Sequence, residues 1–296
     1  MVIAAAATLA AASVLLHCSP DAPGTPRALL ITVDTMRPDR MSLYGYDRDT
    51  TPNLRRFFGD AGFRNARSSA PCTLPAVKQM LTGRLDMQGA TIAEALRDAG
   101  IPTAAVTSQH WFSGDEVYRR GFDHWDVQAG DELDRYGMSA RRASRVTDLA
   151  LDWIRGRSPG ERFFLWVHYF DPHDPYDPPP DARRFSEGVT RYPDGDRRAA
   201  QLAGRTDEEH WFQVDHVFDD EDRDALRRLY DDEIRFTDRE IGRLLDGLEA
   251  RGASGLGVIV SDTFGRPWRE ALVDMAIGSA GVDPILDVRG GVDWAG

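Results

Sequence analysis

Lysine is almost absent from this chain of 296 residues, in which Lys78 is the only one. Arginine therefore supplies nearly all of the basic charge, and acidic residues exceed basic ones to give a formal net charge of −12. General binding to nucleic acid needs a basic face, so this balance argues against that class of function. Arginine does suit bidentate contacts with oxyanions.

Cysteine is scarce as well, because the chain has only Cys18 and Cys72. Residues 1–19 are predicted to be an export signal, since residues 2–16 are nearly all Ala, Val, Ile and Leu. This apolar run is shorter than the roughly 20 residues that a transmembrane helix needs. It also lacks the basic residues that normally precede the apolar part of a signal. When Cys18 is lipidated or removed with the signal, Cys72 remains alone and no intramolecular disulfide framework can form.

The end of that segment, Leu15-Leu16-His17-Cys18-Ser19, is similar to a bacterial lipoprotein cleavage site, although a small residue is usual where His17 stands. We therefore expect an exported protein that is periplasmic or membrane-anchored, with a possible lipid on Cys18. A plain cleaved signal and a loose membrane anchor are the alternatives. Contact with a membrane is expected only through this segment or a lipid anchor.

The chain after the predicted signal begins with a Pro-rich tether at residues 20–27. The total length suffices for one large α/β domain or two small ones.

Apolar runs and helical spacings alternate along the chain. Consecutive apolar residues predict buried strands at 28–33, 103–107, 163–169 and 257–260, and spacings of three to four predict helices at 89–99, 140–154 and 223–248. Residues 177–220, rich in Pro, Arg and Asp, predict a long surface excursion. This alternation is typical of an α/β fold with a mostly parallel central sheet and helices on both faces.

Polar residues follow three of the predicted strands at their carboxyl ends. Asp34 follows the first strand, His173 comes shortly after the third, and Asp262 follows the last. The carboxyl ends of parallel strands meet at one edge of the sheet, where ligands collect. Carboxylates at this edge can hold a divalent cation, although each aspartate alone is also explained as a helix N-cap or turn residue.

Several segments, taken together, resemble the sulfatase family of the alkaline-phosphatase-like superfamily. They are Val33-Asp34-Thr35-Met36-Arg37-Pro38-Asp39, Tyr44-Gly45-Tyr46, Thr51-Pro52-Asn53-Leu54, the run from Phe163 to Tyr176, and Val258-Ile259-Val260-Ser261-Asp262, in family order. The resemblance covers residues 28–265, the expected catalytic domain, and leaves residues 266–296 as a tail. It implies an alkaline-phosphatase-like α/β fold and a metal-dependent hydrolase of sulfate or phosphate esters. Its partner would be a small-molecule or glycan ester, and no nucleic acid.

Hydrolysis of such an ester needs an in-line nucleophile and cationic groups that neutralise the charge on the ester oxygens. A divalent metal ion held by carboxylates lowers the pKa of the nucleophile and binds the ester. The resemblance implies that Asp34 and Asp262 bind the metal together with the nucleophile. It also implies that His173 contacts the substrate and orients or protonates it. We expect one metal ion, Ca²⁺, with Mg²⁺ or Mn²⁺ as alternatives.

The segment from Ala70 to Arg84 places two candidate nucleophiles, Cys72 and Thr73, before a short apolar run that ends in Thr-Gly-Arg. Sulfatases oxidise the cysteine of a Cys-x-Pro-Ser-Arg signature to formylglycine, and that cysteine lies nine residues before the Thr of Thr-Gly. Counting back from Thr82 gives Thr73, and Thr73-Leu74-Pro75 has the matching spacing to proline. We therefore predict Thr73 as the nucleophile, near a helix N-terminus, and no formylglycine. An ordinary N-cap threonine is the alternative.

A threonine nucleophile resembles the phosphodiesterase and the phosphoglycerol- or phosphoethanolamine-transferase branches of the superfamily. Ala76 and Val77 replace the Ser and Arg of the signature, so Lys78 is the candidate to bind substrate as the substitute cation.

The predicted metal site also departs from the family. Thr35 stands where many sulfatases have a second Asp, and Thr263 follows Asp262 where His or Asn is usual. The site is therefore one ligand short. His168, inside a predicted strand, is interpreted as a core residue.

After Gly265 the resemblance stops, where the family continues with Gly-Glu, a His-Gly segment and a smaller C-terminal subdomain. We expect that subdomain to be missing. The runs Gly265-Arg266-Pro267-Trp268 and Asp274-Met275-Ala276-Ile277 can be encoded so that a one-base shift reads Gly-Glu-Ala-Leu and His-Gly-His. A frameshift is our expectation for residues 266–296, with truncation or a diverged tail as alternatives. A catalytically inactive, truncated sulfatase-like protein is therefore the alternative to an active hydrolase.

Overall fold

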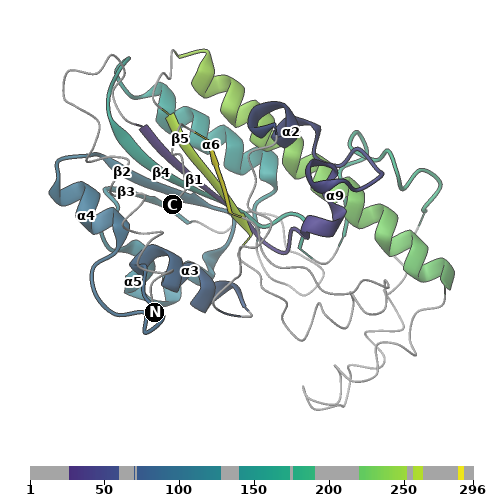
Figure 1. Ribbon diagram of the computed structural model, residues 1–296, viewed down its shortest axis with the longest axis horizontal. Helices are drawn as coiled ribbons and strands as arrows, with labels where there is room; N and C mark the ends of the chain where they lie inside the picture. Colours follow the sequence, from purple (N-terminus) through teal and green to yellow (C-terminus); the bar gives the residue numbers. More distant parts are fainter. Residues whose placement is uncertain are drawn as a thin grey trace, which may run out of the picture.

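A six-stranded sheet forms the centre of the computed structural model, which describes residues 27–59, 70, 72–127, 140–173, 176–190, 220–251, 256–262 and 286–289 (Figure 1). The strands lie in the order β3-β2-β4-β1-β5-β6. Their bounds are β1 Arg27–Val33, β2 Thr103–Thr107, β3 His124–Asp126, β4 Phe163–Tyr169, β5 Leu256–Asp262 and β6 Leu286–Arg289. Neighbouring strands are parallel except β5 and β6, which are antiparallel. The mostly parallel sheet predicted from the sequence is confirmed.

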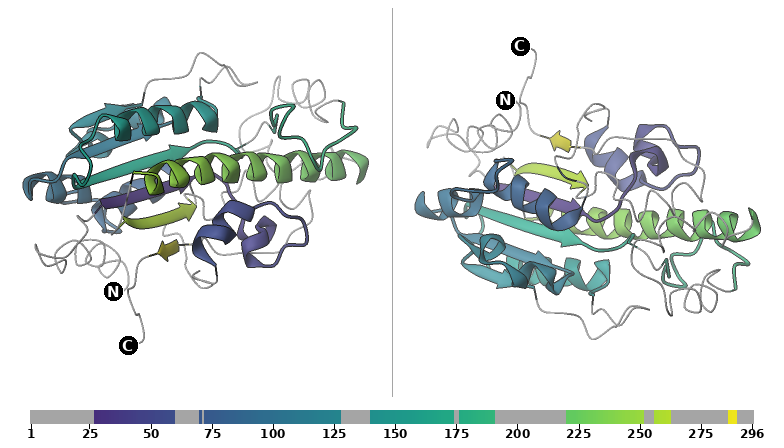
Figure 2. Two further views of the ribbon diagram at one scale, coloured as in Figure 1. Left: turned by 90° about the horizontal axis from the view of Figure 1, so that it is seen from above. Right: turned by 90° about the horizontal axis from the view of Figure 1, so that it is seen from below.

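Helices cover both faces of this sheet (Figure 2). They are α2 Pro52–Phe58, α3 Thr73–Thr82, α4 Ile92–Asp98, α5 Glu116–Arg119, α6 Ala143–Arg155 and α9 Asp220–Glu249, with the short 3-10 helices η1 Pro38–Arg40, η2 Ser42–Tyr44 and η3 His110–Gly114. The three helices predicted from spacing correspond to α4, α6 and α9. Helix α4 begins later than predicted because a capping box between Thr91 and Glu94 fixes its start.

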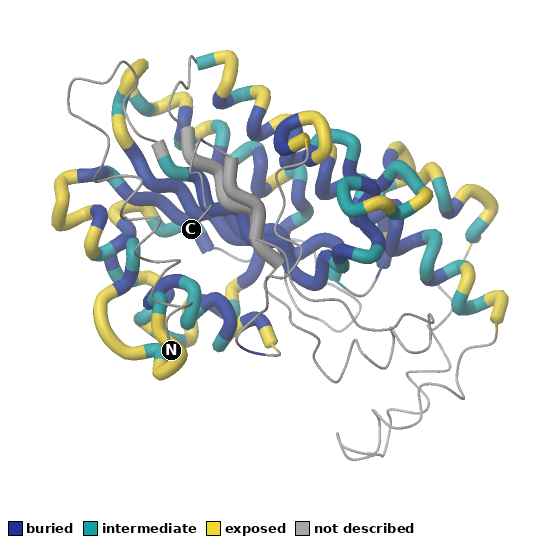
Figure 3. Tube along the Cα trace, viewed as in Figure 1, coloured by how far each residue is buried: buried dark blue, intermediate teal, exposed yellow. Residues whose placement is uncertain are grey.

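Side chains that alternate along the central strands divide the core into two layers. Leu29, Ile31 and Val33 of β1 pack with α2, α6 and α9, whereas Leu30 packs with α3, α4 and α5 on the other face. Figure 3 shows the central strands buried between helices whose outer turns are exposed. Strands buried on both faces have continuous apolar sequences, which explains why the sequence predicted β1 and β4 but not the short, partly exposed β3.

Four buried acidic residues of α9, which we call the acid row, bind segments far away in the sequence: Asp231, Asp232, Glu233 and Asp238. A buried carboxylate is costly unless it accepts hydrogen bonds. Asp231 accepts one from Tyr46 Oη and one from Arg48 Nη1, each at 2.8 Å. Asp238 accepts the backbone N–H groups of Asn53 at 2.9 Å and Leu54 at 2.8 Å. It therefore caps the N-terminus of α2 from a neighbouring helix.

The acid row also fixes the segment that follows β4. Asp232 accepts the backbone N–H groups of residues 184, 185 and 186, the shortest bond measuring 2.8 Å. Glu233 accepts the N–H of Asp177 at 2.8 Å. Burial raises the pKa of Glu233 well above its ordinary value, and the charge of Asp171 raises it further. The segments after β1 and β4 are thus both anchored to α9.

Several sequence-based predictions fall outside the described residues. They are the export signal at 1–19, the possible lipid on Cys18, all but the last residue of the tether, and residues 191–219 of the predicted excursion. Among the helices that the structure does describe, none has the length and apolar character needed to cross a membrane.

Replacing Asp238 with Ala removes the acceptor for two backbone N–H groups at the start of α2. We expect the free energy of unfolding to fall by about 2 kcal/mol, measured by chemical denaturation with circular dichroism. Asp246→Ala is the matched control, because Asp246 lies exposed on the same helix and pairs with Arg56 at 2.9 Å. Exposed ion pairs contribute only about 0–1 kcal/mol, so equal losses in the two variants would contradict the capping role.

Candidate functional site

A hydrogen bond joins two of the predicted site residues, Asp34 and Thr73. Asp34 follows β1 directly, and its backbone N–H donates to the carbonyl oxygen of Tyr169 at 2.9 Å. The Asp34 side chain is completely buried. Thr73 Oγ1 donates toward this carboxylate and lies 3.0 Å from Oδ1 and 3.2 Å from Oδ2. The hydroxyl selected by counting along the sequence therefore faces the first predicted metal ligand.

Thr73 is the first residue of α3, so the predicted position at a helix N-terminus is confirmed. Pro75 is tolerated two positions later because N–H groups of the first turn have no partner within the helix. Gly83 follows the helix in the left-handed conformation, with φ 64°. The N-terminal end of the helix dipole is positive, which favours an anion beside Thr73.

Cys72 differs from its neighbour in its surroundings. It precedes α3 with an extended backbone, and its thiol is free and exposed. Partial desolvation raises the pKa of the Cys72 thiol above its ordinary value. Nucleophilic cysteines have a lowered pKa instead. Of the two candidates, Thr73 is the one whose side chain bonds the Asp34 carboxylate.

Thr35, the residue after Asp34, has a strained backbone. Its φ is 57°, in the left-handed region that β-branched residues rarely adopt. Tyr230 of α9 holds this turn, since its hydroxyl donates to the Thr35 carbonyl at 2.5 Å and accepts from the Arg37 N–H at 2.9 Å. The Thr35 hydroxyl is buried without a hydrogen-bond partner among the described residues. Backbone strain and an unused buried hydroxyl often mark functional sites.

Asp262 lies at the same edge of the sheet as Asp34. It is the last residue of β5 and pairs in register with Val33, the residue before Asp34. The backbone of β5 thus brings the second predicted metal ligand next to the first in the sheet. Its side chain, and the whole of Thr263, lie outside what the structure describes.

The described residues contain no group of three or more His, Cys, Asp or Glu side chains that could hold a metal ion. The donors that they do place at this edge include oxygens, namely the Asp34 carboxylate, the Thr73 hydroxyl and the unused Thr35 hydroxyl. Oxygen ligands suit hard divalent cations such as Ca²⁺ and Mg²⁺. These residues therefore fit such a cation, and the predicted set of Asp34, Thr73 and Asp262 stays a prediction.

His173, the predicted substrate-contacting residue, belongs to an aromatic group after β4. Its ring stacks on Phe170 with centroids 4.3 Å apart, and Trp111 approaches it edge-on at 6.3 Å. The His173 backbone N–H also donates to the Phe170 carbonyl at 2.8 Å. The ring is fixed yet only partly buried. That setting is compatible with contact to a substrate, and the role itself stays a prediction.

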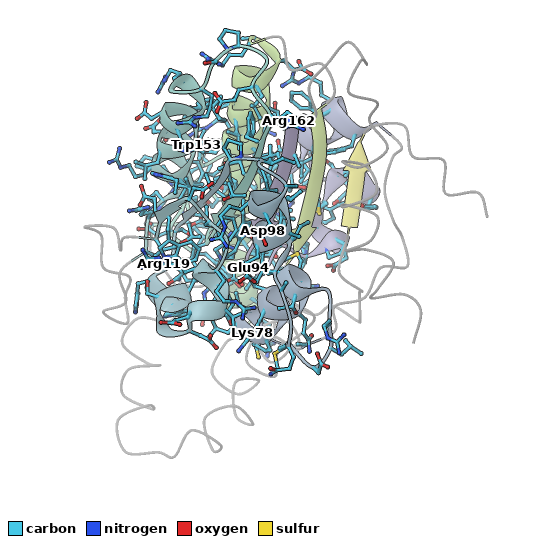
Figure 4. The ribbon with its side chains drawn as sticks, turned by 90° about the vertical axis from the view of Figure 1, so that its left-hand side faces the viewer. Lys78, Glu94, Asp98, Arg119, Trp153 and Arg162 are labelled. Carbon is cyan, nitrogen blue, oxygen red and sulfur yellow. The ribbon has the colours of Figure 1, made fainter. Side chains whose placement is uncertain are left out.

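Lys78, the predicted substitute cation, is engaged elsewhere. Its ammonium group donates to Asp115 Oδ2 at 2.6 Å, beside the short helices on this face of the sheet (Figure 4). Lys78 lies five positions after Thr73, so it projects from a different side of α3. Val77, four positions after Thr73, lies on the same side and is completely buried. The substrate-binding role of Lys78 stays a prediction.

His168 is completely buried, which agrees with its interpretation as a core residue, but sequence reasoning missed that its ring lies beside Asp34. Its Nε2 is 3.9 Å from Asp34 Oδ2, and its Nδ1 is 2.7 Å from Thr32 Oγ1. Burial lowers the pKa of His168 to about 3, and the charge of His173 lowers it further. Only the register of β1 and β4, which pairs Thr32 with His168, brings this ring to Asp34. That register could not be read from the sequence.

The family model described as Sulfatase matches residues 26–262. This range runs from β1 to the end of β5 and contains every residue of the site described above.

Solved structures share this architecture. The C-terminal periplasmic domain of EcEptC from Escherichia coli has a TM-score of 0.55 and 21% identity, with 80% of this chain and 63% of that one covered. A phosphonate monoester hydrolase of Agrobacterium radiobacter has a TM-score of 0.60 and 18% identity, with 89% and 68% covered. A protein solved with its substrate D-glucosamine-2-N,6-O-disulfate has a TM-score of 0.64 and 18% identity, with 89% and 71% covered. At such identities the likeness shows the alkaline-phosphatase-like α/β fold alone.

The C-terminal part of the chain matches a second, different family. A second family model, described as F420-0:Gamma-glutamyl ligase, matches residues 237–296. Coenzyme F420:L-glutamate ligase from Methanothermobacter thermautotrophicus is 42% identical over 62 residues, which is 21% of this chain and 25% of the ligase. The Methanopyrus kandleri ligase is 51% identical over 41 residues, 14% of this chain and 16% of the ligase. A segment translated in the wrong frame would not resemble another enzyme family, so the expected frameshift in residues 266–296 is wrong.

The raised pKa of Cys72 predicts that its thiol reacts slowly with alkylating agents. In a Cys18→Ala background, alkylation by iodoacetamide should be slow at pH 7 and should accelerate with pH, with a midpoint above the ordinary value of about 8.5. Mass spectrometry of the alkylated peptide over pH 6 to 10 measures the rate. Rapid alkylation below pH 7 would mean a thiolate-stabilising environment, and would return Cys72 to consideration as the nucleophile.

Proposed function

Because this chain belongs to the sulfatase family, we propose that it is a metal-dependent hydrolase of sulfate or phosphate esters with Thr73 as its nucleophile. The observation that carries this proposal is the buried hydrogen bond from Thr73 Oγ1 to Asp34 Oδ1 at 3.0 Å. It supports a hydroxyl nucleophile at the position where most sulfatases have formylglycine.

The metal ion would be held by Asp34, Thr73 and Asp262, and when bound it would lower the pKa of the nucleophile and neutralise charge on the ester. Ca²⁺ is the expected ion, with Mg²⁺ or Mn²⁺ as alternatives. One related solved structure of the EcEptC domain is a complex with Zn.

The residues themselves supply the other steps. Thr73 Oγ1 attacks sulfur or phosphorus and forms a new ester bond as the bond to the leaving alcohol breaks. Asp34 accepts the hydrogen bond of this hydroxyl and so holds Oγ1 in place, and the proton of the hydroxyl passes to solvent. His173 gives a proton to the leaving oxygen, and the positive end of α3 favours the negative charge that develops. Water then hydrolyses the threonine ester and restores the hydroxyl.

A transferase or phosphodiesterase is the second candidate. The threonine ester formed by Thr73 can pass its group to an alcohol instead of water, and the choice depends on which acceptor the site admits.

The same chain would be catalytically inactive if the metal site is incomplete. Thr263, which stands where His or Asn is usual, and the Lys78–Asp115 ion pair favour that alternative.

Activity of nucleophile variants tests the proposal. The purified chain is assayed with Ca²⁺, Mg²⁺ or Mn²⁺ against an aryl sulfate, an aryl phosphate and an aryl phosphodiester. Thr73→Ala should lower kcat by about 10³-fold or more, because removal of a nucleophile typically has that effect. Thr73→Ser should keep most activity, and Cys72→Ala should be unchanged.

Each remaining outcome has a definite meaning. Loss of activity in Cys72→Ala with activity kept in Thr73→Ala would reverse the assignment of the nucleophile. Transfer of the group to an added alcohol, in competition with water, would identify the transferase. Inactivity of the parent chain with every metal and substrate would establish the inactive alternative.

We also propose that the chain is exported, with residues 1–19 as the signal and Cys18 as a possible lipid-bearing residue. The motif at Leu15 to Ser19 supports this proposal. In a bacterial host, the full chain should incorporate labelled palmitate and fractionate with membranes, whereas Cys18→Ser should do neither. Equal labelling of the two proteins would exclude Cys18 as the lipid site. A cleaved, unlabelled periplasmic product would indicate the plain signal.

A further inference from the structure

A chain of buried polar atoms runs from the core of the sheet toward Asp34. Trp166 Nε1 donates to Thr32 Oγ1 at 2.9 Å, and Thr32 Oγ1 lies 2.7 Å from His168 Nδ1. The opposite ring nitrogen, His168 Nε2, lies 3.9 Å from Asp34 Oδ2. All four side chains are completely buried. His168 Nε2 has no hydrogen-bond partner among the described residues.

The donors in these groups, together with the nearby Asp34 carboxylate, favour one direction for the hydrogen bonds. An indole N–H can only donate, so Thr32 Oγ1 is an acceptor toward Trp166. A hydroxyl has two lone pairs and one hydrogen, so Thr32 Oγ1 can still either donate to His168 Nδ1 or accept from it. The Asp34 carboxylate selects between these two arrangements: when Thr32 donates to Nδ1, the neutral ring carries its hydrogen on Nε2, and Nε2–H faces Asp34. The opposite tautomer would set the lone pair of Nε2 against an acidic oxygen, with no donor between them.

Packing holds the ring in this direction. Phe112 meets the His168 ring edge-on with centroids 4.9 Å apart, and the same phenyl ring contacts Trp166 at 5.2 Å. Register pairs Thr32 with His168 across β1 and β4, so both side chains lie on one face of the sheet. The ring therefore cannot turn without displacing core residues.

We infer that His168 is a positioning residue for Asp34, with its Nε2–H directed at Oδ2 by the hydrogen-bond chain from Trp166 through Thr32. At 3.9 Å the N–H and the carboxylate attract each other without a full hydrogen bond. Asp34 then receives the Thr73 hydroxyl on one side and the imidazole on another. The orientation of the carboxylate, and through it that of the nucleophile, depends on the tautomer of His168. This inference rests on the proposed roles of Asp34 and Thr73.

The tautomer is measured directly by long-range ¹H–¹⁵N correlation NMR of the full chain labelled with ¹⁵N-histidine. The chain has 7 histidines, and loss of one signal set in His168→Gln assigns this ring. We expect a protonated Nε2 and an unprotonated Nδ1. Thr32→Val should change the tautomer ratio while Thr32→Ser should keep it. Asp34→Asn should shift the Nε2–H resonance, and the remote control Asp115→Asn should not. A protonated Nδ1, or no response to Thr32→Val and Asp34→Asn, would overturn the inference.

Paired amide substitutions test the consequence for catalysis. The amide nitrogen of Gln can take the place of Nε2, whereas that of Asn takes the place of Nδ1. We expect His168→Gln to keep most of kcat, and His168→Asn to lower kcat by about 10- to 100-fold, as is typical for residues that orient a ligand, with KM little changed. Equal kcat values in the two variants would exclude the positioning role. If the parent chain has no activity, the proposed function fails, and the NMR result still decides the tautomer and its contact with Asp34.

Discussion

The acid row of α9 is the constraint on which the arrangement around Asp34 depends. Buried carboxylates destabilise a fold unless donors meet them, and these donors are backbone N–H groups and cationic side chains of the segments after β1 and β4. The same helix supplies Tyr230, which holds the strained Thr35. One of these segments follows Asp34, and the other contains His173. The position of α9 therefore constrains the geometry of the candidate site. Removal of one acid would leave several polar groups unsatisfied together, so the contacts act as a set.

The sequence predicted those parts of the fold that depend on local pattern. Strands β1 and β4 were predicted because a sheet covered on both faces requires continuous apolar runs. Helix α9 was predicted from its apolar spacing, yet that spacing gave no sign that Asp231 and Asp238 share the buried side. Their burial depends on Arg48 and Asn53, which lie far away in the sequence. Short elements such as β3 carry too few residues to show a period.

The residues of the candidate site also differ in how far the sequence could predict them. The resemblance to sulfatases implied that Thr73 and Asp34 belong to one site, and the structure places them in hydrogen-bond contact. Lys78 was assigned by residue type, whereas its direction depends on the turn of α3 and on Asp115. His168 was placed in the core correctly, but its proximity to Asp34 follows from the register of two strands that are distant in sequence. Register is not readable from a single strand.

Strand β5 belongs to both family matches, which overlap over residues 237–262. Its Gly-Val-Ile-Val run is what any buried parallel strand requires, so this run alone distinguishes little between two α/β families. The structure pairs it in parallel with β1 and in antiparallel with β6. The case for Asp262 as a metal ligand therefore rests on its register opposite Val33, one residue before Asp34, and on the Thr73–Asp34 contact. Those two facts hold whichever family the strand resembles more, because they concern its place in the sheet.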